Sequence, residues 1–296
     1  FKDTNKQITF GDITTGDWEK MINVKGNAHF TLGTLLDASA KSGYNGCSIY
    51  IEKSVTNRRE VVIQSDGGEI NLYACHISSE TSYSVLQLQY GNGNIYNIFM
   101  NNVGFFYLPT GYDVYDIIIQ HAHWALLQTL SQNMSNVYAG SCYSIVYLGG
   151  SSNYYFRNVV AFDNTIFAQI YNFEGNAYVI DSVCDTWSAT WSGTTLTGVI
   201  YRQYTFNPII TYVNGSSVAY AHVILKDRYN NTIIDDYTDS DGRILNGTEP
   251  YIVTYAFYNQ TGGSTPYLQS PHHLTITKAG YATYETNITI DHPVID

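Results

Sequence analysis

One short pattern recurs along the first two thirds of the sequence and constrains the fold more than any other feature. It is an Asn or Asp followed by apolar residues, and its copies begin at Asn71, Asn97, Asp116, Asn136, Asn158 and Asp181. The copies lie 26, 19, 20, 22 and 23 residues apart, with a mean of 22. A second apolar segment follows most copies, and turns rich in Gly, Asn or Ser come next. Such a period is typical of a solenoid built from stacked repeats.

A repeat of ~20 to 25 residues with two or three short strands fits one rung of a parallel β-helix, where each rung buries its inward side chains on the next. Asn suits the anchor position because it tolerates left-handed backbone and its amide can hydrogen-bond along a stack. Residues 40–203 therefore resemble right-handed parallel β-helix proteins, by period and residue type rather than by a sharp motif. The variable spacing leaves a large antiparallel sandwich as the alternative.

The residue types favour an all-β protein, because Tyr, Val, Ile, Thr and Phe dominate and helical apolar spacing is scarce. The one stretch with apolar spacing that fits a helix runs from Trp18 to Leu36, and Gly26 and Gly33 interrupt it. We expect residues 1–39 to form an N-terminal segment or cap of the coil, and residues 40–203 to form the parallel β-helix.

From about residue 204 the pattern changes to that of a small antiparallel sandwich. A strand with Ala-x-Val-x-Leu (221–225), a Thr-Asp-Ser-Asp-Gly turn (238–242) and a Lys-Ala-Gly-Tyr segment (278–281) follow in this order. Residues 204–296 resemble the carboxypeptidase regulatory-like (transthyretin-like) β-sandwich, which implies an accessory or spacer module of secreted and cell-surface proteins without catalysis of its own. Gly242 and Gly280 are expected at positive φ. The segment 246–271 is longer than the pattern requires.

The chain has 296 residues and a formal net charge of −11, which argues against a nucleic-acid partner. Charged residues make up only 13% of the chain, whereas Tyr (28) and Gly (24) are abundant. Most of its polar side chains are therefore uncharged. The sequence contains no apolar run of ~18 residues, so we expect no transmembrane helix. The sequence begins at Phe1 without a leader, so we expect that a signal or longer N-terminal segment was removed and that the protein is extracellular or at a cell surface.

Sequons for N-glycosylation are concentrated in the C-terminal region. Five of the seven Asn residues from residue 204 onward begin an Asn-x-Ser/Thr sequence, where chance gives about one or two. This excess favours covalent glycans on the surface of the sandwich. The sequons begin at Asn133, Asn214, Asn230, Asn246, Asn259 and Asn287.

Four cysteines, Cys47, Cys75, Cys142 and Cys184, all lie in the N-terminal region and lack Cys-x-x-Cys spacing. Their even count in a protein expected to be secreted makes them disulfide candidates, while their apolar surroundings equally favour buried thiols inside the coil.

Many β-helix proteins that this chain resembles cleave polysaccharides, and hydrolytic cleavage uses a pair of carboxylates. Asp163 and Asp185 lie 22 residues apart, one rung, so their carboxylates could sit about one strand spacing from each other, ~4.8 Å. Arg157 is a nearby cation. The two carboxylates belong to no familiar signature, and single Asp residues at turns are common, so we expect no enzyme.

Metal binding has two candidate segments. His121 and His123 share one face of a strand and could bind a metal with His76 or Asp113, but surface histidines on a turn are the commoner arrangement. Asp239 and Asp241 resemble the start of a calcium loop without its later Glu, which favours a hairpin turn. We therefore expect neither a metal nor another cofactor.

Two classes of function follow from the sequence. The first is a secreted, glycosylated structural protein of a cell surface, filament, tube or layer, whose copies assemble through β-rich and Tyr-rich faces. Terminal strands, residues 1–12 or Ile288–Ile290, are candidates for donation between copies. The second is a polysaccharide-binding or polysaccharide-cleaving protein with sugar-stacking rings at Trp124, Trp187 and Trp191.

Overall fold

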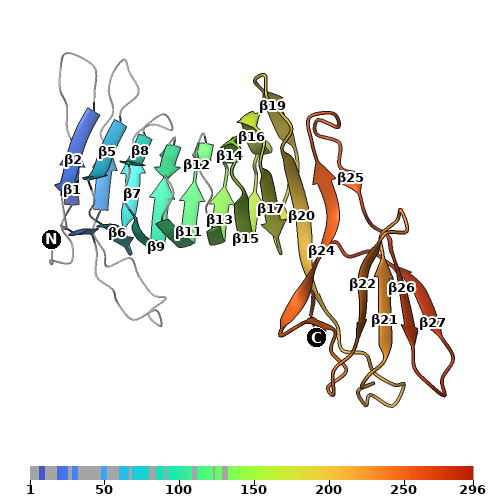
Figure 1. Ribbon diagram of the computed structural model, residues 1–296. Helices are drawn as coiled ribbons and strands as arrows, with labels where there is room; N and C mark the ends of the chain where they lie inside the picture. The colour runs from blue at the N-terminus through green and yellow to red at the C-terminus, as the bar shows by residue number, and fades with distance from the viewer. Residues whose placement is uncertain are drawn as a thin grey trace. The chain divides into compact units, whose positions relative to one another are not determined.

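Figure 1 shows the computed structural model, which describes residues 7–10, 19–25, 29–32, 48–51, 60–66, 69–79, 85–89, 92–103, 105–108, 112–122, 124–128 and 133–295. Every regular element in these ranges is a β-strand, which confirms the all-β prediction. The chain forms two compact units, Phe1–Asn176 with Val183–Gly198, and Ala177–Ser182 with Val199–Asp296. No helix long and apolar enough to cross a lipid bilayer occurs in the described ranges.

The first unit contains two parallel sheets. The first sheet contains β1 (Gln7–Phe10), β3 (His29–Leu32), β4 (Ser48–Ile51), β6 (Glu69–Tyr73), β7 (His76–Ser79), β9 (Gly93–Asn101), β11 (Tyr112–Gln120), β13 (Asn133–Gly140), β15 (Tyr154–Phe162) and β18 (Val183–Cys184). The second sheet contains β2 (Glu19–Lys25), β5 (Glu60–Asp66), β8 (Val85–Gln89), β10 (Phe105–Leu108), β12 (Trp124–Gln128), β14 (Ser144–Gly150), β16 (Ile166–Phe173) and β19 (Ala189–Ser192).

Strands from β9 to β16 alternate between the two sheets, so each rung gives one strand to each (Figure 1). Neighbouring strands are parallel in both sheets. The region is therefore a β-solenoid of the parallel β-helix type, and the antiparallel alternative is wrong for it. The helical exception at residues 18–36 is also wrong, because its described parts are strands that pair with β5 and β6. Pairing between rungs overrides the local pattern there.

The predicted anchors mark a left-handed residue inside the long strands of the first sheet. Asn97, Asp116, Asn136 and Asn158 have φ of 56°, 57°, 56° and 56°, and Asp181, in the second unit, has φ of 51°. In β9 the left-handed residue resets the alternation, because Tyr96 and Asn97 both point outward between buried Ile95 and Ile98. Each anchor therefore bends its strand around the core.

The first predicted anchor, Asn71, is wrong. The left-handed residue of that rung is Ala74, with φ of 48°. Tyr73 pairs with Tyr96, so Ala74 is the residue in register with the left-handed Asn97. Asn71 instead accepts the Asn94 backbone N–H through Oδ1 at 2.9 Å.

The interior of the coil is a set of aliphatic columns. Ile98, Ile117, Val137 and Val159 are in register and at most 1% exposed. Burying a side chain of this kind contributes roughly 1.5–3 kcal/mol, so each added rung extends the core.

The second unit contains one antiparallel sheet and a second set of strands whose pairing is mostly antiparallel. One consists of β22 (Thr232–Tyr237), β21 (His222–Lys226), β26 (His272–Thr277) and β27 (Tyr284–Ile288), in that order. The other is built on β20 (Val199–Asn207) and β24 (Glu249–Tyr258), with β17 (Asn176–Ile180), β23 (Leu245–Asn246), β25 (Tyr267–Leu268) and β28 (Val294–Ile295).

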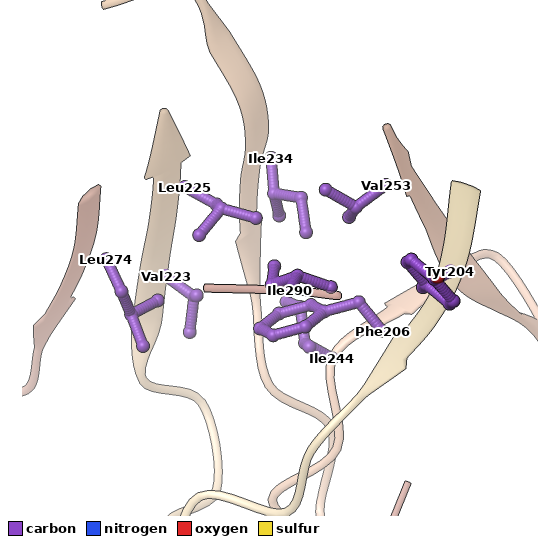
Figure 2. Close-up of a cluster of buried hydrophobic side chains, with 9 residues drawn as sticks. All are labelled: Tyr204, Phe206, Val223, Leu225, Ile234, Ile244, Val253, Leu274 and Ile290. Atoms are coloured by element: carbon purple, nitrogen blue, oxygen red, sulfur yellow. The ribbon is translucent and has the colours of Figure 1, made fainter. Parts of the chain in front are cut away.

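Figure 2 shows the core of this unit, in which side chains from both sheets meet. Phe206 and Val253 come from the β20–β24 sheet, and Val223, Leu225 and Leu274 come from the other. Gly242 and Gly280 have φ of 79° and 83°, as predicted for the turns. The long segment 246–271 supplies β24, which pairs with β20 along seven register positions from Ile200↔Tyr258 to Phe206↔Tyr251.

Candidate functional site

Two columns of side chains run along the outer face of the first solenoid sheet. The tyrosine column consists of Tyr73, Tyr96 and Tyr115, which face one another in register. The Tyr73 and Tyr96 ring centroids are 4.6 Å apart, and the Tyr96 and Tyr115 rings stack at 4.8 Å and 9°. Burial raises the pKa of Tyr96, and the neighbouring Tyr115 and Tyr73 raise it further. These spacings follow the strand spacing, so stacking results directly from the register.

The apolar column lies on the other side of the anchors and consists of Phe99, Ile118, Tyr138, Val160 and Val183. Tyr138 is 52% exposed and Val183 is 62% exposed. Phe162, 46% exposed, lies beside the column over Gly140, where a Cβ would come within 2.5 Å of the Phe162 Cζ. The apolar column with Phe162 is therefore a contiguous apolar strip, in which Tyr138, Phe162 and Val183 are exposed and the other side chains are partly exposed.

The asparagine ladder, Asn97, Asp116, Asn136 and Asn158, separates these two columns. Asn136 Nδ2 donates to Asp116 Oδ1 at 2.8 Å, and Asn158 Nδ2 donates to Asn136 Oδ1 at 3.1 Å. The ladder is exposed, and from Asp116 to Asn158 its side chains hydrogen-bond from rung to rung. It therefore stabilises the bend while adding only one charge to the face.

A second left-handed ladder, which the sequence did not predict, lies at the corner after the first sheet. This corner ladder consists of Asn102, His121, Ser141 and Asp163, with φ between 52° and 59°. Ser141 Oγ donates to Asp163 Oδ2 at 2.8 Å, and the Asp163 backbone N–H donates to Asp185 Oδ2 at 3.0 Å. The structure thus brings Asp163 and Asp185 together on successive rungs, with both carboxylates bonded to their neighbours in the corner.

Arg157 does not join these two carboxylates. It lies in β15, in register with Ser135, six residues before Asp163, which corresponds to a strand length of roughly 20 Å. The two carboxylates also stand in one column rather than on opposite sides of a cleft. This geometry suits the capping of turns, whereas a glycosidase pair must flank the bond that it cleaves.

The corner ladder lines an open hollow of about 370 Å³. Its floor contains buried Ala122 and Cys142, and Tyr143 and Thr165 lie at its sides. Asp163 is exposed at the hollow, and its Oδ2 accepts from Ser141 Oγ. The hollow therefore presents polar groups beside an aromatic ring.

The metal candidates do not converge in the described part of the chain, where no three His, Cys, Asp or Glu side chains could bind one ion. His121 is exposed at the corner and His76 is half-buried in β7, while His123 and the Asp113 side chain lie outside the description. Burial lowers the pKa of His76.

Asp239 and Asp241 lie in a turn of the second unit. Asp239 Oδ1 accepts the backbone N–H groups of Asp241 and Arg243, each at 2.8 Å. This carboxylate therefore closes the turn, as the hairpin interpretation expects.

Cys75, Cys142 and Cys184 are buried thiols, and Cys47 lies outside the described residues. By register they belong to different rungs of the coil, two or more apart, so at ~4.8 Å per rung their Cα atoms exceed the ~7 Å limit for a disulfide between any two of them. Burial raises the pKa of Cys142 to about 11. These three side chains fill the interior of the coil.

The tryptophans give no open platform for sugar in the described residues. The Trp187 ring packs on Phe167 with centroids 4.8 Å apart, and Trp191 is half-buried in β19. The Trp124 side chain lies outside the description. The stacked tyrosines were visible in the sequence as residues 23 and 19 apart, each just before a left-handed position, but the pattern was missed.

Five of the six sequon asparagines are exposed, and Asn259 is partly exposed. In Asn214, Asn259 and Asn287 the side-chain Oδ1 takes part in hydrogen bonds, with Ser216, Gly262 and His273. These bonds involve Oδ1 and not the Nδ2 atom to which a glycan attaches.

Comparison with known proteins gave no match to a protein-family model, to a curated protein or to a solved structure.

Proposed function

We propose that the protein is a structural component of a cell surface or of an extracellular filament, tube or layer, N-glycosylated on the sandwich and self-assembling through the outer face of the solenoid. The observation that carries this proposal is the apolar strip formed by the apolar column with Phe162. Contiguous apolar patches on a protein surface favour association. The partner we assign to the strip is a second copy of the chain.

The composition of this face supports a protein interface. Tyr and Phe provide large contact areas at low entropy cost, and charged residues are depleted in interface cores. The asparagine ladder beside the strip has one carboxylate, Asp116, and from Asp116 to Asn158 its side chains are already hydrogen-bonded to one another. The charges that contact would desolvate beside the strip include Asp116 and the exposed Arg157 of β15.

A charge in the strip tests this proposal. We expect the wild type to form filaments, tubes or sheets in negative-stain microscopy and Tyr138→Asp to form none, since about half of a ~200 Å² side chain is exposed for contact. Tyr171→Asp is the matched control, because Tyr171 is 50% exposed but lies in β16 of the second sheet. A wild type that stays monomeric at high concentration contradicts the proposal, as does assembly that survives Tyr138→Asp.

The corner hollow favours a second candidate function, the binding of a neutral polysaccharide. The exposed Tyr143 ring beside the exposed Asp163 carboxylate offers a sugar ring both a stacking face and a hydrogen-bond acceptor. Titration with neutral oligosaccharides, followed by saturation-transfer NMR, is expected to show binding that Tyr143→Ala and Asp163→Asn weaken and Tyr155→Ala does not. Release of reducing ends that Asp163→Asn abolishes would instead make the protein an enzyme.

A further inference from the structure

The sandwich exposes the edges of its sheets. In one sheet β22 and β27 are the outer strands, and each pairs with a single neighbour (Figure 1). In the other sheet the far side of β24 pairs only with the short strands β23 and β25. Unpaired edge strands invite pairing with another chain, so soluble proteins guard them with charge, proline, bulges or covering segments.

The C-terminal sequons follow these edges. Asn287 lies within β27 and Asn246 within β23. Asn230 lies two residues before β22, and Asn259 directly follows β24 in the turn that leads to β25. Only Asn214 lies elsewhere among the five, in the turn between β20 and β21.

Of the two edge strands in the four-stranded sheet, β27 has fewer charged residues than β22. Its sequence, Tyr-Glu-Thr-Asn-Ile, has one charge and no proline, and none of its residues is fully buried. The Asn287 side chain is exposed, and its Oδ1 lies 3.1 Å from His273 Nδ1 on the neighbouring strand. A glycan on Asn287 Nδ2 would extend from the edge strand itself.

We propose that N-glycans at Asn230, Asn246, Asn259 and Asn287 block edge-to-edge β-pairing of the sandwich, so that copies associate only through the solenoid. A glycan is bulky and hydrated, and one at each edge prevents a second strand from approaching within the ~4.8 Å that pairing requires. This inference rests on the glycosylation in the proposed function.

The test uses the full chain, produced in a host that performs N-glycosylation, in a Tyr138→Asp background that removes the solenoid contact. Mass spectrometry of glycopeptides first measures occupancy. Sedimentation velocity then compares Asn287→Gln with Asn287→Lys, because both lack the glycan but Lys protects an edge strand by charge. Asn214→Gln removes a glycan away from the edges.

We expect Asn287→Gln to associate at a concentration at least tenfold lower than the Tyr138→Asp parent, with Asn287→Lys and Asn214→Gln unchanged. Empty sequons would remove the glycosylation proposal and this inference with it. Occupied sequons with Asn287→Gln still monomeric would overturn the inference alone. Association of Asn287→Lys or Asn214→Gln would overturn it too, because the glycan would then act through general solubility.

Discussion

Replacement of Asn136 tests how the bent strands of the solenoid are stabilised. The residue has φ of 56°, donates to Asp116 at 2.8 Å and accepts from Asn158 at 3.1 Å. Asn136→Ala removes both exposed hydrogen bonds, worth ~0.5–1 kcal/mol each, and keeps a Cβ in left-handed backbone without the polar side chain that lets Asn tolerate that conformation, which costs ~1–2 kcal/mol. We expect the free energy of unfolding to fall by about 2–4 kcal/mol.

Asn136→Gly is the matched variant, since it loses the same bonds without the steric cost, and its expected loss is about 1–2 kcal/mol. Stability should therefore decrease in the order Asn, Gly, Ala. In an ordinary strand Gly is the weaker of the last two by ~0.5–1 kcal/mol, so the predicted order is reversed. Urea unfolding followed by far-UV circular dichroism, with equal m-values, measures it. An Ala variant as stable as the Gly variant would refute the reasoning.

Three further predictions concern packing and titration. Gly175→Ala should lower the free energy of unfolding by about 3 kcal/mol, because its Cβ would lie 1.9 Å from the Ser152 carbonyl oxygen. Gly215→Ala, which has open space around its Cβ, should lower it by only ~1 kcal/mol. Thermal melts measure both variants, and equal losses of stability would contradict the prediction. His272 is 0% exposed and burial lowers its pKa, so the unfolded state binds the proton first and stability should fall by up to ~1.4 kcal/mol per pH unit below about pH 6.5. Urea unfolding at pH 7.5 and 5.5 measures this slope, and His272→Leu should flatten it; an unchanged slope would remove His272 as its source. Cys142, with a pKa of about 11, should resist iodoacetamide at pH 8 until the protein is unfolded; rapid modification of the native protein, located by peptide mass spectrometry, would contradict its burial.

The solenoid could be predicted from the sequence because its bend selects a residue type. A left-handed position favours Asn and Asp, so the spacing of Asn97, Asp116, Asn136 and Asn158 in the sequence equals the length of each rung. The same logic failed at Ala74, where the register forces left-handed backbone on a residue with no preference for it. Pairing between rungs, which a single sequence does not display, decided that position.

The corner ladder could not be predicted for the same reason. Asn102, His121, Ser141 and Asp163 share a backbone conformation but no side-chain chemistry. Asp163 and Asp185 were placed together correctly by the 22-residue spacing, yet their hydrogen bonds to the corner backbone and to Ser141 depend on three-dimensional contacts. In the sandwich, segment 246–271 is longer than the pattern requires, and the role of its strand β24, which pairs with β20, could not be predicted because the residues that carry the resemblance lie in and around the other sheet.

The solenoid register also explains how a small sequence feature becomes a surface. Because neighbouring strands stay in register, one outward position per rung becomes a continuous column with a repeat of ~4.8 Å. The rungs differ in length, but from β9 to β15 the first-sheet pairing remains unbroken, so the extra residues lie outside it. Tyr138 and Val160 therefore stay aligned although Asn136 and Asn158 are two residues further apart than Asp116 and Asn136. Turns can consequently change length without interrupting the apolar strip, and adding a rung enlarges the core and the outer face together.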